Sequence, residues 1–360
     1  MRLRPVLLSL LALTLTTACA TTDTSTIKAA AVDTSKDRGP AAELRLGYFA
    51  NVTHAGAVYG AGAGTFAEAL GSETALKTQD FNAGPAAVEA LFAGSIDATF
   101  IGPNPAINGF VKSGGQALRI VSGATSGGAS LVVAEGITSP AQLEGKILST
   151  PQTLGTQDIA LRTWLADKGF EVDEAGAGDV TIRAQENAQT LQEFQAGRIA
   201  GAWVPEPWAS RLVLEGGGTV LVDEKTLWPD GEFVTTHLVV RTQYLEEHPQ
   251  TVKKLLEGQV AAGKAIASDL PGAKAVVNAE LKELTGKALK PATIDRAFEG
   301  IEITTDPLAE TLKTSAEHAV ATGLTKEADL TGIYDLTLLR EVLGTDVSDA
   351  GLGAPSQKKG

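Results

Sequence analysis

Apolar residues recur at helical spacing within a clearly bounded stretch, residues 81–105. Between residues 85 and 93 they fall at i, i+3 and i+4, which predicts a helix with one apolar face. Gly94 stands where a left-handed residue commonly ends a helix. Residues 96–101 then predict a short buried strand, and Gly102-Pro103-Asn104-Pro105 is expected to end it as a loop.

The same order of elements recurs 103 residues later in the chain. Under that shift Ala93-Gly94-Ser95-Ile96 falls on Ala196-Gly197-Arg198-Ile199, and Phe100 falls on Trp203, which favours a core position for that tryptophan. The loop Gly102-Pro103-Asn104-Pro105 falls on Pro205-Glu206-Pro207-Trp208. The repeat therefore predicts two similar α/β lobes, with the two loops as opposite walls of one cleft.

Strand-like and helix-like segments alternate along most of the chain. The predicted strands are 43–49, 76–81, 96–101, 118–122, 130–134, 147–150, 180–183, 199–204, 220–222 and 233–241. Helices are expected near 54–70, 85–93, 106–113 and 157–168, and residues 243–320 look helical with little strand. Alternation at this spacing indicates mostly parallel sheets flanked by helices, in which ligands bind beyond the carboxyl ends of the strands.

Composition and charge narrow the class of partner. The chain has 360 residues, 43% of them hydrophobic, which is enough for two cores. The residues beyond the first 18 include 28 basic and 43 acidic side chains, a formal charge of −15. Such an acidic surface disfavours nucleic acid as a partner.

The N-terminal pattern predicts a targeting segment. Arg2 and Arg4 precede an apolar run at 6–15 that is too short to span a membrane. Leu15-Thr16-Thr17-Ala18-Cys19 resembles a bacterial lipoprotein signal, and Cys19 is the one cysteine of the chain. We therefore favour lipidation of Cys19 over an ordinary cleaved signal. Residues 1–18 are expected to be the signal peptide and 19–42 a flexible tether that anchors the chain at the outer face of the cytoplasmic membrane.

Several motifs together resemble one known family. They are Asn82-Ala83-Gly84-Pro85, Leu91-Phe92-Ala93-Gly94-Ser95-Ile96-Asp97, Gly102-Pro103-Asn104-Pro105, Leu143-Glu144-Gly145-Lys146, Gly155-Thr156-Gln157-Asp158 and Ala202-Trp203-Val204-Pro205-Glu206-Pro207-Trp208. Over residues 43–260 the chain is similar to the solute-binding proteins of bacterial ABC importers for alkanesulfonates, taurine and nitrate. Many sulfonate and taurine binders have Trp-Asp-Pro where this chain has Pro205-Glu206-Pro207.

The resemblance implies a two-lobed periplasmic-binding-protein type II fold that closes over a small anion and delivers it to permease subunits. It implies lobe 1 at 43–127 and 234–345 and lobe 2 at 128–233. Residues 346–360 have no apolar periodicity and are expected to be a disordered tail. The chain is then expected to cross between the lobes near 125–130 and 228–236, and to be a monomer.

The loops at the strand ends contain few cationic side chains. An anion is therefore expected to bind backbone N–H groups at helix N-termini and hydroxyl groups. The candidate ligand residues are Asn51, His54, Asn82, Gly84, Gly102, Asn104, Ser122, Thr153, Gly155, Thr156, Glu206, Trp208 and Thr235. For any one of them, local turn capping is an equally good interpretation. Glu206 could also cap a turn or pair with a ligand ammonium group.

The sequence does not favour an enzyme, a cofactor or a metal. The four histidines, at 54, 237, 248 and 318, do not have zinc-ligand spacing, and the Gly-x-Ser-x-Gly and phosphate-loop motifs are absent. We expect a binding protein for an aliphatic sulfonate, taurine or a nitrate-like anion. Two alternatives remain: the same fold with an aromatic carboxylate or a thiamine-precursor pyrimidine as ligand, and a sensory or interaction lipoprotein without transport.

Overall fold

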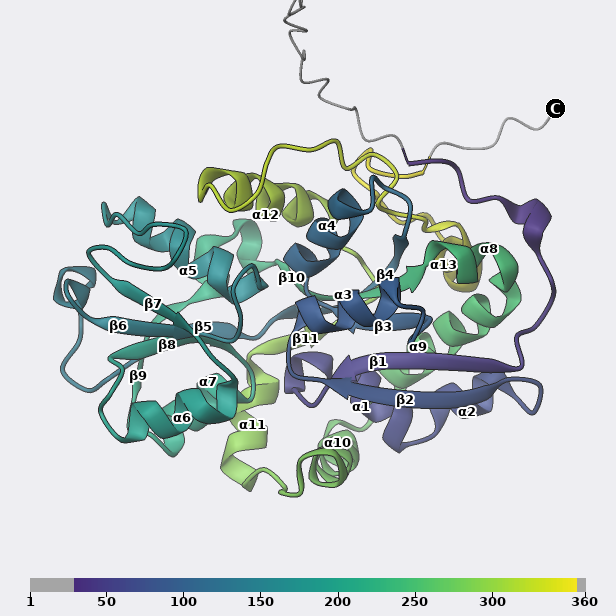
Figure 1. Cartoon of the computed structure of the whole chain (residues 1–360). Coiled ribbons are helices and arrows are strands. Elements are labelled where there is room, and N and C mark those ends of the chain that lie inside the picture. Colours follow the sequence, from purple (N-terminus) through teal and green to yellow (C-terminus); the bar gives the residue numbers. More distant parts are fainter. Residues whose placement is uncertain (1–28, 355–360) are drawn as a thin grey trace, which may run out of the picture.

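Two separate β-sheets divide the chain into two lobes (Figure 1). The computed structural model describes residues 29–354. Lobe 1 has the strand order β11-β4-β10-β3-β1-β2, and lobe 2 has the order β7-β6-β8-β5-β9. The strands of lobe 1 are β1 (Glu43–Phe49), β2 (Ala75–Phe81), β3 (Ala98–Ile101), β4 (Leu118–Gly127), β10 (Val234–Arg241) and β11 (Ile301–Ile303). Those of lobe 2 are β5 (Ala129–Val133), β6 (Ile147–Thr150), β7 (Thr181–Ala184), β8 (Gly201–Pro205) and β9 (Thr219–Asp223).

Helices cover both sheets. Around lobe 1 lie α1 (Ala55–Gly62), α2 (Thr65–Leu70), α3 (Gly84–Phe92), α4 (Pro103–Lys112), α8 (Thr242–Glu247), α9 (Pro249–Ser268), α10 (Leu270–Thr285), α11 (Pro291–Glu299), α12 (Ala309–Ala321) and α13 (Thr337–Leu343). Around lobe 2 lie α5 (Thr156–Asp167), α6 (Asn187–Gln195) and α7 (Trp208–Leu214). Because α12 packs on α5 and α11 packs on α7, the C-terminal helices contact both lobes.

The sheets are mixed rather than mostly parallel. β1 pairs in parallel with β2 and β3, and β6 pairs in parallel with β7 and β8. β10 and β5, in contrast, run antiparallel to both of their neighbours. These two strands follow the crossings between the lobes, so each enters its sheet from the opposite direction to the βαβ strands.

The sequence repeat corresponds to a structural repeat. α3 and α6 match at both ends under the shift of 103 residues. Each helix is followed by a left-handed glycine, Gly94 or Gly197, with φ of 67° in both. In lobe 1, β1 lies between β2 and β3, and in lobe 2, β6 lies between β7 and β8 in the same way. Two copies of one βαβ arrangement thus form the two lobes.

Two chain crossings join the lobes side by side. The first passes from β4 to β5 through Gly127 and Gly128, and the second runs from the end of β9 to Phe233. The crossings are bonded to each other, since Gly127 N–H donates to the Phe233 carbonyl at 3.1 Å and the Thr235 hydroxyl donates to the Gly127 carbonyl. A movement of one lobe relative to the other would turn about these two crossings, which we call the hinge.

Lobe 2 has its own core, built on Trp203. Its side chain is fully buried, as the sequence repeat predicts, and meets Trp164 edge-on at 6.2 Å between ring centroids. The Trp203 Nε1–H donates to the buried Glu224 carboxylate at 2.7 Å. Burial raises the pKa of Glu224 to about 7. Glu224 begins the second crossing, so this core anchors the hinge.

Several expected boundaries differ from the structure. Pro103-Asn104-Pro105 is the first turn of α4 and not a loop, because proline is tolerated where backbone N–H groups have no helical partner. The region 243–320 is helical with little strand, as expected: it holds α8 to α12 and one strand of three residues, β11.

Both ends of the described chain pack on lobe 1. Within the expected tether, Arg38 N–H donates to the Glu247 carbonyl and Ala41 N–H to Thr251 Oγ1. Within the expected disordered tail, Val347 is buried and Ala354 N–H donates to the Tyr334 carbonyl. Residues 29–42 and 346–354 are therefore ordered on lobe 1, contrary to the expectation. The signal peptide and Cys19 lie outside the described residues.

Candidate functional site

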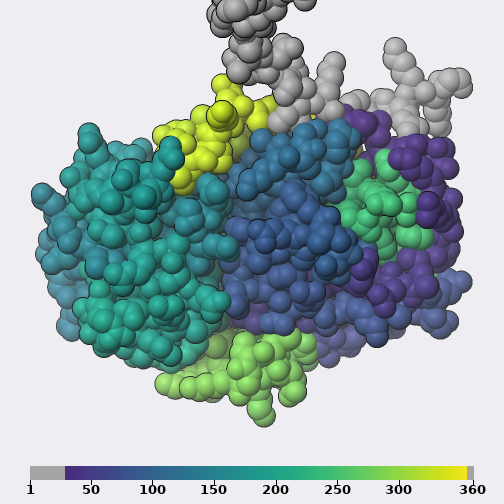
Figure 2. Space-filling model, viewed as in Figure 1, coloured from purple at the N-terminus to yellow at the C-terminus, as the bar shows by residue number. Residues whose placement is uncertain are grey.

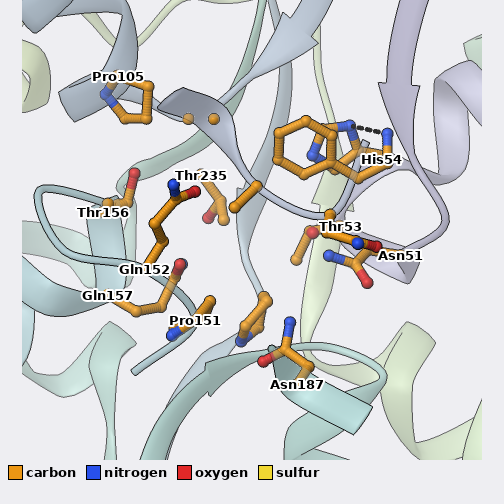
Figure 3. A pocket seen from close by; sticks show the side chains of 17 residues that line it. Asn51, Thr53, His54, Pro105, Pro151, Gln152, Thr156, Gln157, Asn187 and Thr235 are labelled. Atoms are coloured by element: carbon orange, nitrogen blue, oxygen red, sulfur yellow. Dashed lines mark hydrogen bonds between the residues drawn. The ribbon is translucent and has the colours of Figure 1, made fainter. Parts of the chain in front are cut away.

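A small cavity lies where the two lobes meet, as the close-up shows (Figure 3). The space-filling view shows the teal residues of lobe 2 and the blue residues of lobe 1 in contact along one boundary (Figure 2). We call the small cavity the inner cavity, and its volume is about 40 Å³. Its lining comprises Phe49, Asn51, Thr53, His54, Asn82, Ala83, Gly84, Gly102, Pro105 and Thr235 from lobe 1, and Pro151, Gln152, Gly155, Thr156, Gln157, Asn187 and Pro205 from lobe 2.

Equivalent positions of the two repeats line this cavity from opposite sides. Under the shift of 103 residues, the lining residues pair as Phe49 with Gln152, Thr53 with Thr156, His54 with Gln157, Gly84 with Asn187, and Gly102 with Pro205. The two repeats therefore contribute equivalent positions to the two sides of the cavity. The lobe 1 half is the more aromatic, while amide side chains dominate the lobe 2 half.

Helix N-termini supply the positive potential at this site. α3, α5 and α6 begin at Gly84, Thr156 and Asn187, and all three residues line the cavity. Among the described lining residues none has an acidic side chain, a lysine or an arginine. The N-terminal ends of helices carry partial positive charge and free N–H donors, so the cavity is suited to a small anion held without a cationic side chain.

His54 presents a neutral hydrogen-bond donor. The Phe49 N–H donates to His54 Nδ1 at 3.3 Å, which places the imidazole proton on Nε2. Burial lowers the pKa of His54 to about 3, so the ring carries no charge near neutral pH. The ring also stacks on Phe49 at 4.3 Å between centroids. This orientation leaves Nε2–H as the polar group that the ring can offer to a ligand.

A buried ion pair shapes the lobe 2 wall. Asp158, in the first turn of α5, accepts from Leu154 N–H at 3.0 Å and pairs with Arg162 at 3.2 Å. Leu154 adopts a positive φ of 64°, an unfavourable conformation for leucine that this bond helps to hold. Asp158 thereby positions the loop that carries Gln152 and the start of α5.

Hydrogen bonds join the lobes around the cavity. Trp208 Nε1–H donates to Asn51 Oδ1 at 2.9 Å, and the Glu206 carbonyl accepts from Val52 and Thr53 N–H at 3.1 and 3.3 Å. At the exposed rim, Asn82 Nδ2 donates to Glu186 Oε1 at 2.9 Å. An outer cavity of about 590 Å³ adjoins this rim and shares Asn82, Ala83, Pro151 and Gln152 with the inner one.

The structure brings part of the predicted site together. The predicted residues that line the inner cavity are Asn51, His54, Asn82, Gly84, Gly102, Gly155, Thr156 and Thr235. Thr153 lines the outer cavity instead. The others do not line either cavity: Asn104, Ser122, Glu206 and Trp208.

These four side chains are engaged within the protein. Asn104 Nδ2 donates to the Ser315 carbonyl of α12 at 3.1 Å, and the Ser122 hydroxyl donates to the Gly123 carbonyl at 2.7 Å. The Glu206 carboxylate accepts from Ser210 N–H at 3.0 Å. Glu206 therefore caps a turn, which is one of the two interpretations that the sequence left open for it. Burial raises the pKa of Glu206, which disfavours the charged carboxylate that would have to pair with a ligand ammonium group.

The sequence analysis missed several lining residues. Gln152 and Asn187 lie outside the motifs that the sequence analysis singles out, and Gln157 lies within one of them, Gly155-Thr156-Gln157-Asp158, but is not among the candidate ligand residues. The repeat offers a signal for two of them, because the shift of 103 residues maps the candidates His54 and Gly84 onto Gln157 and Asn187.

Within residues 29–354 there is no group of three or more His, Cys, Asp or Glu that could hold a metal ion. The helices of the same range include none that is both long and apolar enough to span a bilayer.

Comparison with known proteins identifies the family. The model of the NMT1-like family matches residues 37–280, well over half of the chain. The chain belongs to the NMT1-like family. This confirms the resemblance that the motifs predict, and it agrees with a binding protein rather than an enzyme.

Curated relatives of this NMT1-like chain are distant. A putative binding protein of Brucella abortus is 26% identical over 223 residues, which is 59% of this chain and 63% of the relative. The taurine-binding periplasmic protein of Escherichia coli is 26% identical over 199 residues, 55% of this chain and 59% of that protein. The matches thus span less than two thirds of either relative.

Solved structures confirm the two-lobed fold of this NMT1-like chain. The alkanesulfonate-binding protein SsuA of Xanthomonas axonopodis, bound to MOPS, superposes with a TM-score of 0.65 at 21% identity, covering 80% of this chain and 96% of that one. The periplasmic nitrate-binding protein NrtA of Synechocystis gives 0.71 at 17% identity, covering 88% and 91%. At these identities the likeness concerns the fold alone.

Proposed function

We propose that this chain is the solute-binding component of an ABC importer and captures a small oxyanion between its lobes. The observation that carries the proposal is the inner cavity, which equivalent positions of both repeats line together. Membership of the NMT1-like family and the likeness to the taurine-binding protein support it. The chain then works outside the cytoplasm, anchored through Cys19, and delivers its ligand to permease subunits.

The size and charge of the cavity favour a compact anionic group. A volume of about 40 Å³ is only a few times the ~10–15 Å³ that one water molecule requires. This suits a sulfonate head group or nitrate better than an aromatic ring. The adjoining outer cavity gives the tail of an aliphatic sulfonate or taurine a way out of the inner one.

Binding proceeds by closure at the hinge. A ligand that contacts His54 in lobe 1 and Thr156 in lobe 2 stabilises the arrangement in which the lobes touch. The interlobe hydrogen bonds of Asn51 and Glu206 form in the same arrangement. The population of the closed form therefore rises with ligand concentration, and this is the form that a permease would recognise.

A thermal-shift screen tests the ligand class. The panel contains alkanesulfonates, taurine, nitrate, an aromatic carboxylate and a pyrimidine, each at matched ionic strength. We expect a saturable rise in melting temperature with one of the first three. Stabilisation by the aromatic acid or the pyrimidine alone would favour the alternative ligands. The absence of saturable stabilisation by any of them would contradict the proposal and favour a scaffold without a small ligand.

A further inference from the structure

The outer cavity has a negatively charged lining. Asp80 and Glu186 both line it, and both residues are exposed. Among the described residues that line it there is no lysine and no arginine. A ligand that reaches the inner cavity through the outer one therefore passes two carboxylates. Charge of this sign slows the approach of an anion, because a cleft of like charge lowers the local concentration of its ligand.

Glu186 is the carboxylate of this lining that a hydrogen bond holds in place. Its Oε1 accepts from Asn82 Nδ2 at 2.9 Å across the boundary between the lobes. Asn82 lines both cavities, and Asn187, which follows Glu186 in the chain, lines the inner one (Figure 3). The charge of Glu186 therefore lies about one side chain away from the inner cavity.

The carboxylate of Glu186 does not neutralise the helix that begins beside it. Glu186 is the N-cap residue of α6, a position at which a carboxylate can accept from the free N–H groups of the first turn. Its side chain makes no such bond and is held by Asn82 of lobe 1 instead. The positive end of α6 thus remains available to a ligand in the inner cavity, while the negative charge stays at the rim.

The inner cavity offers partial positive charges, but no full one, to balance a ligand. Its described lining has no lysine and no arginine. Attraction to the helix ends and repulsion by Glu186 both grow in proportion to the charge of the ligand. The cost of taking an ion out of water grows with the square of that charge. A second negative charge on the ligand is therefore penalised both by desolvation and by Glu186.

We propose that Glu186 is a specificity-determining residue that restricts the inner cavity to singly charged anions. Its repulsion of a dianion is about twice its repulsion of a monoanion at the same place. Sulfate and hydrogen phosphate are therefore excluded, while nitrate and sulfonates are accepted. A repulsive element of this kind sets specificity and also lowers the affinity for the accepted ligand. This inference rests on the proposed function and adds the charge of the ligand to it.

Glu186→Gln separates the charge from the hydrogen bond, because glutamine keeps an oxygen that can accept from Asn82. We would titrate nitrate and methanesulfonate into the full chain by calorimetry, at low and matched ionic strength, and measure sulfate by competition. The wild type should bind the better of the two monoanions at least about tenfold more tightly than sulfate. For charges on the order of 10 Å apart, Glu186→Gln should strengthen monoanion binding about threefold and sulfate binding about tenfold. Glu144→Gln, an exposed substitution that precedes β6 and so lies at the end of that strand away from the cavity, should change neither.

A wild type that binds sulfate as tightly as the monoanions would overturn the proposal, as would affinities for the monoanions and sulfate that rise by the same factor in Glu186→Gln. The melting temperature of Glu186→Gln checks the fold and should equal that of the wild type, since the bond to Asn82 is kept. If the wild type binds no anion at all, the proposed function fails together with this inference. Anion binding with an unchanged preference in Glu186→Gln refutes the inference alone.

Discussion

The indole N–H of Trp208 donates to Asn51 Oδ1 at 2.9 Å and so joins lobe 2 to lobe 1 beside the inner cavity. Asn51 lines that cavity and Trp208 does not. The guanidinium of Arg211 lies 4.6 Å from the centre of the indole ring and steadies it. Under the proposed function, Trp208 is therefore a positioning residue that would act on the ligand through Asn51.

Trp208→Phe should weaken anion binding about fivefold, because it removes one interlobe hydrogen bond worth about 1 kcal/mol and keeps the aromatic packing. Titration calorimetry measures the effect. Trp164→Phe, in the core of lobe 2, serves as the control and should alter stability without altering affinity. An affinity that Trp208→Phe leaves untouched would show that this bond has no part in closure.

Anion affinity should not change in a stepwise way between pH 5 and pH 8. The pKa of His54 is about 3, so its imidazole stays neutral and keeps Nε2–H as a donor throughout this range. His54→Ala should lower affinity about tenfold, and His54→Gln, which copies the equivalent Gln157, should lose less. His248→Gln is the control outside the cavity. A step near pH 6.5 that disappears in His54→Ala would contradict this account.

Glu224 should make the protein less stable as the pH rises. Its folded pKa of about 7 lies above the ordinary value of 4.5, so between these values the folded state binds the proton and the unfolded state does not. The stabilisation is complete below pH 4.5 and is lost by about pH 7. Relative to the wild type, Glu224→Gln should gain on the order of 3 kcal/mol between pH 4 and pH 8.

Urea unfolding at the two pH values measures this difference. The buried His54 and His237, whose pKa values are lowered, have the opposite pH dependence, but they are present in both proteins and cancel in the comparison. Glu144→Gln, at an exposed position, should follow the wild type. Parallel pH profiles for Glu224→Gln and the wild type would refute the assignment.

The sequence predicts the architecture well because the architecture depends on local patterns. The apolar spacing before Gly94 and Gly197 marks α3 and α6 in both lobes. The candidate site is harder to predict, since a polar side chain can serve a ligand or its own fold equally well. Asn104 and Thr156 both follow a strand, yet one donates to Ser315 and the other lines the cavity. Only tertiary packing separates these roles.

Asn104→Ala and Thr156→Ala should therefore have different effects. Asn104→Ala leaves the buried Ser315 carbonyl without that donor and should cost about 1–3 kcal/mol of stability, with affinity largely kept. Thr156→Ala should lower anion affinity several-fold with a small effect on the melting temperature. Thermal unfolding and calorimetry on both variants test this. The reverse pattern would place the ligand near Asn104.

The close approach of Gly102 and Thr156 offers the most direct test of the central claim, that an anion binds between closed lobes. A Cβ atom at Gly102 would overlap Thr156 Oγ1 across the cavity. Calorimetric titration of the anion found in the screen should show that Gly102→Ala weakens binding about tenfold or more. Gly102→Ala combined with Thr156→Ala should bind more tightly than Gly102→Ala alone, because the overlap is relieved. Wild-type affinity in Gly102→Ala would contradict the account.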